Sequence, residues 1–448
     1  MTEPKAAAST RGELPRAFTT VDAAALFVGI ILGSGIFVAP AAVSAALPSP
    51  RLAVALWILG GLVTVCGALC YAECGARVPR TGGFYVFYQE AYGEAVAFVG
   101  GWIALFVTYP ASVAAIARVF ANYLAEVLGP RFGFQPNLPA VAVIVAGAML
   151  NVFGTRTGAW AQRLLSGTKV VALAALCGAA IFAGRSGVAP ATTLGSSGGW
   201  FGAALLLAGT AVLWTYDGWT DVTLVAGELR DPGKNLRRAV LWGTAVLVAL
   251  YAAVQVSVSL LLPGADAANS PRAFAAAVEA GLGPGAGRAV ALLVVLSTFG
   301  SVTGIILGIS RLCYAMARDG AFIRWFGHAH PRWNTPARAT LAVATASVFY
   351  VFVAQFQALL NYFSFCAWIF YSLTAIALIR FRRQRVGEQN ATAFRRSTIT
   401  PLVVLATGVF MTAGQLTQNP KECAYGLLML AAAFASYFVW RRARTQPT

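Results

Sequence analysis

Charged residues are scarce in this chain. Only 11% of its 448 residues are Asp, Glu, Lys or Arg, whereas 58% are hydrophobic, and the mean hydropathy is +0.70. Soluble domains carry about 25% charged residues, so this composition excludes an ordinary soluble protein. About twelve apolar runs reach the roughly 20 residues that a helix needs to cross a bilayer. The sequence therefore predicts an all-α polytopic membrane protein.

Acids and histidines are few as well, with 16 Asp and Glu and two His in the whole chain. No acid or histidine completes a metal site with Cys66, Cys70 and Cys74, because His328 and His330 lie in a loop. These cysteines are expected at a helix interface. The spans contain no nucleophile–base pair and no phosphate-binding loop. We therefore expect no enzyme activity, no cofactor and no metal.

Basic residues outnumber acids, which gives a formal net charge of +17. If both termini are cytoplasmic, 26 of the 33 basic residues lie on the inner side, as in the loop 381–397. This is the positive-inside bias, which fixes orientation and does not indicate a nucleic-acid partner. The first 20 residues are polar and precede a run too long for a signal peptide. We expect a multi-pass plasma-membrane protein (inner membrane in a bacterium) whose termini are both cytoplasmic.

The run from Val21 to Leu47 is long enough to span a bilayer, but Gly33-Ser34-Gly35 interrupts its centre. These residue types lower helix propensity, and unwound backbone in a membrane must be buried or line a cavity. An unwound turn would leave the N–H groups of Gly33, Ser34 and Gly35 free to bind a carboxylate at a half-helix N-terminus. The alternative is a packing face of small residues.

A second interruption, Asp217-Gly218, falls 184 residues after Gly33 (217 − 33) in another apolar span. Each interruption opens a block of about five spans. Two interrupted helices at matching positions of two halves indicate an inverted-repeat transporter with its site at the midplane. The expected divisions are a polar tail (1–19), a first repeat (20–184), a second repeat (200–380), two further spans (397–440) and a cytoplasmic tail (441–448).

Asp217 and Asp221 are the only acids expected deep in the membrane, where ionisable side chains usually face a pathway or a partner. Asp217 either caps the half-helix that follows it or meets substrate or a proton, and both roles can hold together. Asp221 lies four residues further along the same half-helix, and a structural hydrogen bond is its favoured role.

Several motifs together resemble one family. They are Gly33-Ser-Gly-Ile-Phe-Val-Ala-Pro40, Pro79-x-x-Gly82-Gly83-x-Tyr85, Tyr216-Asp-Gly-Trp219, Glu228-Leu-x-Asp-Pro232, Phe299-Gly-Ser-Val302, Ser310-Arg-Leu312 and Ala317-Arg-Asp-Gly320. They look like the amino acid–polyamine–organocation (APC) superfamily, in its L-amino-acid transporter branch, over about residues 18–440. The resemblance implies the LeuT-like five-plus-five inverted repeat with broken helices 1 and 6. It also implies Na⁺-independent transport of L-amino acids, commonly by exchange.

The resemblance further implies residue roles. Backbone N–H groups of the first interruption would bind the substrate α-carboxylate, and carbonyls beside both interruptions would accept from its α-ammonium. Trp214 takes the place of an aromatic external gate. Lys169 matches the fifth-helix lysine that stands where Na⁺-coupled relatives hold sodium, the alternative being an anchor that snorkels to the interface. The predicted substrate-binding residues are Ile30, Ile31, Gly33, Ser34, Gly35, Trp214, Tyr216, Asp217 and Gly218.

The sequence also departs from the family pattern. Residues 128–138 contain no cysteine, so we expect no disulfide-linked subunit of the kind that pairs with eukaryotic members there. Position 217 is often glycine or serine in the family, whereas an aspartate occurs in some carriers of cationic substrates.

Small neutral substrates are slightly favoured over cationic ones, because the third span supplies no second anion near Asp217. Its small side chains there are Thr108, Ala111, Ser112 and Ala115. A lone carboxylate would bear the whole desolvation cost of a cationic side chain. Two alternatives remain open, namely a proton-coupled symporter of amino acids or polyamines, and a membrane sensor that binds an amino acid without moving it.

Overall fold

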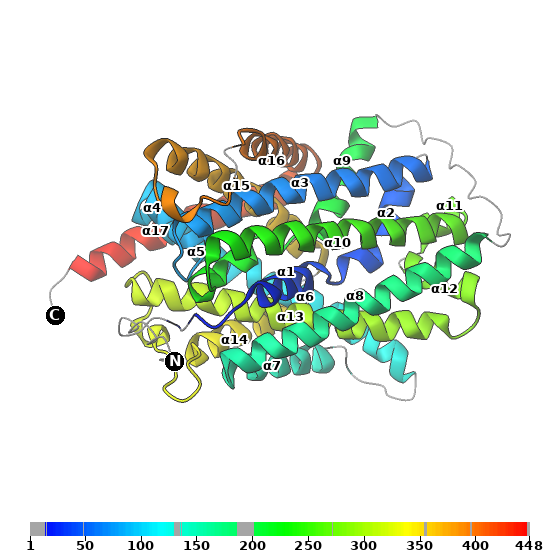
Figure 1. The fold of residues 1–448 in the computed structure, drawn as a ribbon, viewed down its shortest axis with the longest axis horizontal. Helices are drawn as coiled ribbons and strands as arrows, with labels where there is room; N and C mark the ends of the chain where they lie inside the picture. The colour runs from blue at the N-terminus through cyan, green and yellow to red at the C-terminus, as the bar shows by residue number, and fades with distance from the viewer. Residues whose placement is uncertain are drawn as a thin grey trace, which may run out of the picture.

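A computed structural model describes residues 14, 16–47, 49–129, 135, 137–185, 201–270, 272–353, 356–394 and 397–445. Within these ranges every regular element is a helix, apart from an isolated β-bridge between Phe18 and Leu229. The long helices run side by side along one axis (Figure 1). Most of the expected tail 1–19, and the stretch 186–199 between the two expected repeats, lie outside the described residues.

The first half of the chain forms helices close to the predicted spans. They are α1 (Thr20–Ile31), α2 (Gly35–Ala46), α3 (Pro50–Arg77), α4 (Phe84–Tyr92), α5 (Glu94–Ile103), the π-helix η1 (Ala104–Thr108), α6 (Tyr109–Leu128), α7 (Asn137–Val152) and α8 (Thr155–Arg185).

The second half continues the bundle. Its elements are α9 (Phe201–Thr215), the 3₁₀-helix η2 (Asp221–Glu228), α10 (Pro232–Leu261), α11 (Gly264–Asn269), α12 (Ala273–Leu282), α13 (Ala286–Arg318), η3 (Arg324–Gly327), α14 (Ala337–Val353), α15 (Phe356–Gln384), η4 (Glu388–Asn390), α16 (Ile399–Gln418) and α17 (Pro420–Thr445).

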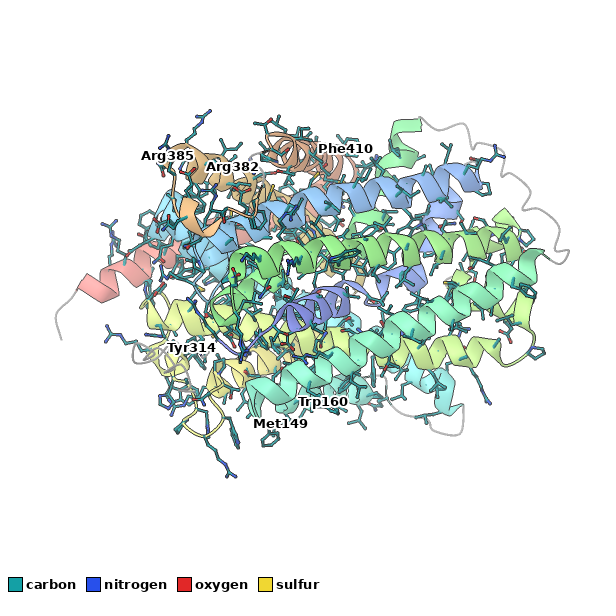
Figure 2. The ribbon with its side chains drawn as sticks, viewed as in Figure 1. Met149, Trp160, Tyr314, Arg382, Arg385 and Phe410 are labelled. Carbon is teal, nitrogen blue, oxygen red and sulfur yellow. The ribbon has the colours of Figure 1, made fainter. Side chains whose placement is uncertain are left out.

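Eight helices of the described chain are long and apolar enough to cross a membrane. Counting α1 and α2 as one bent span, with 48° between them, raises the number to nine. The outer surface suits hydrocarbon, because Trp160 on α8 and Phe410 on α16 project from opposite sides of the bundle (Figure 2) and are 64% and 46% exposed. Exposed apolar side chains are stable in lipid rather than in water. The protein is therefore a multi-pass membrane protein.

The start of α1 is fixed by a capping box. The Thr19 hydroxyl accepts from the Asp22 N–H at 3.4 Å, and the Asp22 carboxylate accepts from the Thr19 N–H at 2.8 Å. Reciprocal bonds of this kind satisfy two backbone donors that a helix N-terminus otherwise leaves unpaired. The Asp22 carboxylate also pairs with Arg163 on α8. This end of α1 is therefore anchored to α8.

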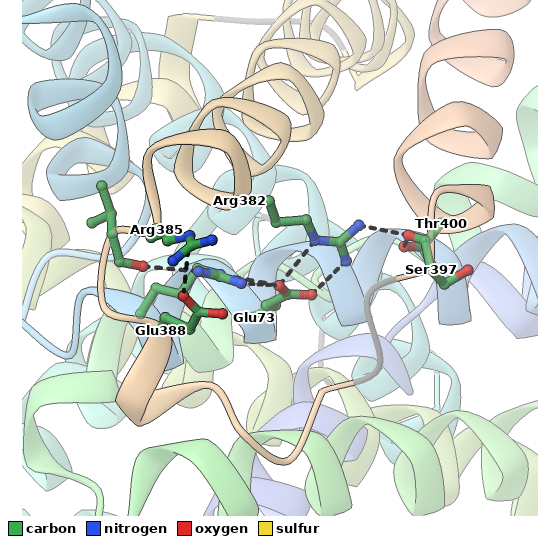
Figure 3. A network of polar contacts seen from close by, with 8 residues as sticks. Glu73, Arg382, Arg385, Glu388, Ser397 and Thr400 are labelled. Carbon is green, nitrogen blue, oxygen red and sulfur yellow. Dashed lines mark hydrogen bonds and ion pairs between the residues drawn. The ribbon is translucent and has the colours of Figure 1, made fainter.

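Three buried charges join α3 to α15 (Figure 3). The Glu73 carboxylate accepts from Arg77 Nε at 3.0 Å and from Arg382 Nη2 at 2.5 Å. Arg77 also donates to the Val386 carbonyl at 2.8 Å, and Arg382 donates to the Ser397 carbonyl at 2.6 Å. Two guanidinium groups share one carboxylate, so one positive charge remains in excess, and the two backbone carbonyls stabilise it. The segment between α15 and α16 is thereby tied to the end of α3.

Candidate functional site

The end of α1 presents backbone carbonyls to a buried cation. The Lys169 ammonium, on α8, donates to the Gly29 carbonyl at 2.7 Å, to the Leu32 carbonyl at 3.2 Å and to Ser301 Oγ at 3.3 Å. An ammonium has three N–H donors, and the C-terminal end of a helix carries partial negative charge. Lys169 is fully buried, so it is not a snorkelling anchor. It joins α8 to α1 and, through Ser301, to α13.

The amides of the first interruption differ in part from the expectation. The Gly33 N–H is not free, because the chain turns tightly after α1 and this group donates to the Ile31 carbonyl at 2.7 Å. For the Ser34 and Gly35 amides, the part of the chain that the structure describes supplies no acceptor. These two N–H groups stand at the start of α2, where the helix dipole favours an anion.

The carbonyls proposed for the substrate ammonium already accept protein hydrogen bonds. Ile30 accepts from Ser301 Oγ at 3.2 Å, and Ile31 accepts from the Tyr251 hydroxyl of α10 at 2.8 Å. The Trp214 carbonyl accepts from the Asp217 N–H at 3.1 Å. A carbonyl oxygen has two lone pairs, so the Ile30 carbonyl can accept a further donor. The Ile31 carbonyl cannot, because it also accepts from the Gly33 N–H at 2.7 Å.

The second interruption lies between α9 and η2. Gly218 has φ +106°, a conformation that favours glycine, and η2 then begins at Asp221 with Thr220 in the N-cap position. Asp217 is therefore not the N-cap of η2, because the turn at Gly218 separates the two. Its carboxylate instead accepts from the Tyr371 hydroxyl on α15.

Two glycines bring the interruptions into contact. A Cβ on Gly35 would lie 2.9 Å from Thr215 Oγ1 and 3.0 Å from its Cα, at the end of α9. A Cβ on Gly218 would lie 2.7 Å from Ile30 Cγ2, at the end of α1. Any side chain at either position would push the two interruptions apart. The small residues therefore serve close packing as well as leaving amides accessible.

A cavity of about 90 Å³ lies where the interruptions meet. This volume exceeds the roughly 10–15 Å³ that admits one water, so the cavity can hold several water molecules. Eight of the nine predicted substrate-binding residues line it. Tyr216 does not, because its ring is buried and its hydroxyl donates to the Trp57 carbonyl at 3.0 Å. Lys169 also lies outside the lining, beyond the α1 backbone.

The cavity has a second acidic residue that the sequence did not mark as part of the site. Asp221 lines it and is 3% exposed, and its Oδ1 accepts from the Tyr109 hydroxyl at 2.5 Å and from Thr220 Oγ1 at 2.9 Å. The predicted hydrogen bonding is thus present, in the wall of the cavity. Tyr109 follows the π-helix η1, and such irregular turns often mark functional sites.

The charges in the cavity are all of one sign. Its lining includes Asp217 and Asp221 and, among the residues that the structure describes, no Lys, Arg or His. The remaining wall is mostly aromatic and aliphatic, with Tyr71 and Tyr371 close to the acids. Tyr371 lies 154 residues from Asp217 in the chain, and Tyr109 lies 112 residues from Asp221. No local sequence pattern could therefore predict either pair.

Comparison with known proteins agrees with this geometry. The serine/threonine exchanger SteT of Bacillus subtilis is 27% identical over 416 residues, covering 92% of this chain and 94% of its own. The human b(0,+)-type amino acid transporter 1 is 29% identical, covering 93% and 86%, and the mouse Asc-type amino acid transporter 1 is 29% identical, covering 97% and 83%.

A solved structure shares the fold at low identity. It is a nucleobase-cation-symport-1 family transporter in a closed conformation with bromovinylhydantoin bound, and it matches with a TM-score of 0.62 and 13% identity over 95% of this chain and 96% of its own. The family model for amino acid permeases matches residues 18–438. The resemblance to the L-amino-acid transporter branch of the APC superfamily is thus confirmed, and the chain belongs to the amino acid permease family.

Proposed function

We propose that the protein is a Na⁺-independent secondary transporter of L-amino acids that works as an exchanger by alternating access. One observation carries the proposal: two interruptions 184 residues apart (217 − 33) meet at a single cavity. Unwound backbone at the midplane is how inverted-repeat transporters bind polar substrates. Membership of a permease family favours transport over the sensing of an amino acid without movement.

The substrate backbone fits between the interruptions. Its α-carboxylate binds the Ser34 and Gly35 amides, and its α-ammonium binds carbonyls beside the interruptions, among them the second lone pair of the Ile30 carbonyl. The Trp214 side chain, half-buried in the cavity wall, closes the site as its external gate.

Lys169 explains why sodium is not required. Its ammonium is a fixed cation between α1 and α13, bound by two carbonyls and one hydroxyl. A bound cation would satisfy the same oxygen atoms. Because lysine is covalently part of α8, this charge is not released to either side during the cycle.

The membrane organisation follows from the same assignment. The bent pair counts as one span, and three apolar helices of 10–17 residues, Asn137–Val152, Ala204–Thr215 and Ala337–Val353, join the eight long ones. Twelve spans result, with repeats at 20–184 and 200–380 and two more spans in 397–440. Because α1 begins and α17 ends toward the same end of the bundle (Figure 1), both termini are assigned to the cytoplasmic side of the plasma membrane. No disulfide-linked subunit is assigned.

Small neutral amino acids such as alanine, serine and threonine are the favoured substrates. Two features support this choice: the cavity of about 90 Å³ and a relative named as a serine/threonine exchanger. Asp221 adds a second acid to the cavity, which revises the premise of a lone carboxylate. A neutral preference then requires that one acid be uncharged.

The test is counterflow in proteoliposomes. Vesicles loaded with one unlabelled L-amino acid should accumulate the labelled form, across a panel that includes alanine, serine, threonine, lysine and arginine. Replacing sodium with choline on both sides should leave the rate unchanged. No counterflow with any of them would contradict exchange, and a steep sodium dependence would contradict the role of Lys169.

A further inference from the structure

We infer that Asp221 binds a proton when the site holds a neutral amino acid, so that a proton accompanies the substrate. This inference rests on the proposed amino-acid transport and assigns the residue whose protonation lowers the negative charge of its cavity from two carboxylates to one. It starts from the two acids of the lining, Asp217 and Asp221, which no basic side chain of the described lining accompanies.

Charge balance demands a cation at this site. A zwitterionic amino acid brings no net charge, so two ionised carboxylates would leave two negative charges in a mostly apolar cavity. Buried charges are costly unless they are paired, and within a membrane the cost is greatest. Either the substrate side chain or a proton must supply positive charge.

The surrounding groups do not supply it. The titratable side chains that share the cavity with Asp221 are Asp217, Tyr71 of α3, Tyr88 of α4, Tyr109 of α6 and Tyr371 of α15, which are acids or phenols. η2 also packs against α1, α10 and α13. On these helices Asp22 pairs with Arg163, Tyr251 donates to the Ile31 carbonyl, and Arg311 pairs with Glu228 at 2.9 Å.

The only buried cation near the first interruption in the described chain is likewise committed. Lys169 uses its three N–H donors on Gly29, Leu32 and Ser301. Neither Lys169 nor any of these three partners lines the cavity. The charge of Lys169 is therefore matched by α1 carbonyls, and the cavity acids need another cation.

A proton fits Asp221 better than an organic cation does. The residue is 3% exposed, and its Oδ1 already accepts two donors. An ammonium or guanidinium would need space and several acceptors, whereas a proton needs one oxygen atom. Asp217 is less buried and stands at the interruption itself, so it remains accessible to the substrate ammonium.

Protonation of Asp221 would also act on the geometry of the site. Its bond to Tyr109 joins η2 to the start of α6. A hydrogen bond to an ionised carboxylate is about twice as strong as a neutral one. Uptake of a proton therefore loosens η2 from α6, and its release to water after the substrate leaves restores the bond.

The experiment measures counterflow of labelled L-serine by the full-length protein, with equal pH on both sides, from about pH 5.5 to about pH 8.5. Wild type should slow as pH rises, approaching tenfold per unit above the midpoint, because one protonated group is required. Asp221→Asn, whose amide mimics the protonated acid, should be nearly independent of pH and exceed wild type at the alkaline end.

Two matched variants complete the test. Asp217→Asn makes the same change at the other acid and should keep the pH slope. Tyr109→Phe keeps both acids but removes a donor to Asp221, and should move the fall in rate to higher pH. If Asp221→Asn cannot be reconstituted, the shift of the pH midpoint in Tyr109→Phe tests whether Asp221 is the protonated group.

The contrary results are distinct. A flat wild-type profile with vigorous counterflow would overturn the proton but leave the proposed transport standing. An unchanged slope in Asp221→Asn, a slope lost only in Asp217→Asn, or an unmoved midpoint in Tyr109→Phe would overturn the assignment to Asp221. Absence of counterflow with every amino acid at every pH would contradict the proposed function itself.

Discussion

The two interruptions of the bundle solve the same problem with different chemistry. At the interruption between α1 and α2, the backbone carbonyls accept hydrogen bonds from the Lys169 ammonium and from the Ser301 hydroxyl. Between α9 and η2 the chain carries its own charge, and Asp217 and Asp221 each accept from a tyrosine of another helix. The partial negative charge at the end of α1 is thus compensated by a lysine from another helix, whereas the second interruption itself adds two acids to the cavity.

This difference assigns separate tasks to the two interruptions. The first offers backbone amides to an anion and is held by a cation that does not leave. The second offers carboxylates, whose charge depends on protons and on the ligand. The first should therefore tolerate no change of shape, and the second should respond to changes of charge.

The largest effect is expected from a change of shape at the first interruption. Gly35→Val should reduce uptake by at least about fiftyfold, because its Cβ would lie 2.9 Å from Thr215 Oγ1 and its branches closer still. Membrane expression should stay near normal. The measurement is uptake per molecule of reconstituted protein.

Gly167→Val is the matched control, since a Cβ on this exposed residue of α8 meets no atom within 4 Å. It should transport like wild type. Normal uptake by Gly35→Val would contradict both the close packing of Gly35 on Thr215 and a role of this interruption in substrate binding.

A smaller but still large effect is expected from removing the fixed cation. Lys169→Met keeps the length of the side chain but removes one donor from each of three acceptors. The Gly29 and Leu32 carbonyls keep Ser301 and Ser297 as donors, so each loss is that of a hydrogen bond to a charged group, about 1.5–3 kcal/mol, and transport should fall by at least about tenfold. Lys234→Met, at a lysine 65% exposed at the start of α10, is the control.

Sodium sharpens this second test. If the ammonium stands in for an ion, added Na⁺ should restore part of the transport of Lys169→Ala, where the ammonium has been removed. Wild-type activity in Lys169→Met would assign the residue to packing alone.

The smallest effect is expected from neutralising Asp217, the less buried acid of the second interruption. Asp217→Asn should weaken competition by all amino acids by about tenfold or less, since one charge-assisted contact is lost. Tyr371→Phe, which removes only the hydroxyl bound to Asp217, should have a weaker effect of the same kind. A selective loss of competition by arginine and lysine in Asp217→Asn would show that cationic side chains are bound there.

Sequence reasoning reached the first interruption more fully than the second. The glycines, the apolar run and Lys169 lie in local patterns, so the helix ends at Ile31 and Gly35 could be predicted within a few residues. The hydrogen bond of the Gly33 amide to the Ile31 carbonyl could not be predicted, because a tight turn after a helix depends on local backbone angles.

At the second interruption, the hydrogen-bond partners of the acids could not be predicted from the sequence. Partners of its acids come from α6 and α15, more than a hundred residues away in either direction. The carbonyl of Tyr216 stays a predicted substrate contact, but its side chain does not line the cavity, because a motif does not determine which way a ring faces. Only the packing of distant helices made Asp221 part of the cavity wall.

The charge cluster of Figure 3 bears on the order in which the chain is made. Ribosomes synthesise α3 long before α15, because Arg382 lies 309 residues after Glu73 in the chain. Arg77, one turn further along α3, already binds the Glu73 carboxylate at 2.9 Å. The nascent helix α3 therefore enters the bilayer with Glu73 already paired to Arg77. Arg382, synthesised later, binds an existing ion pair and not an unpaired carboxylate.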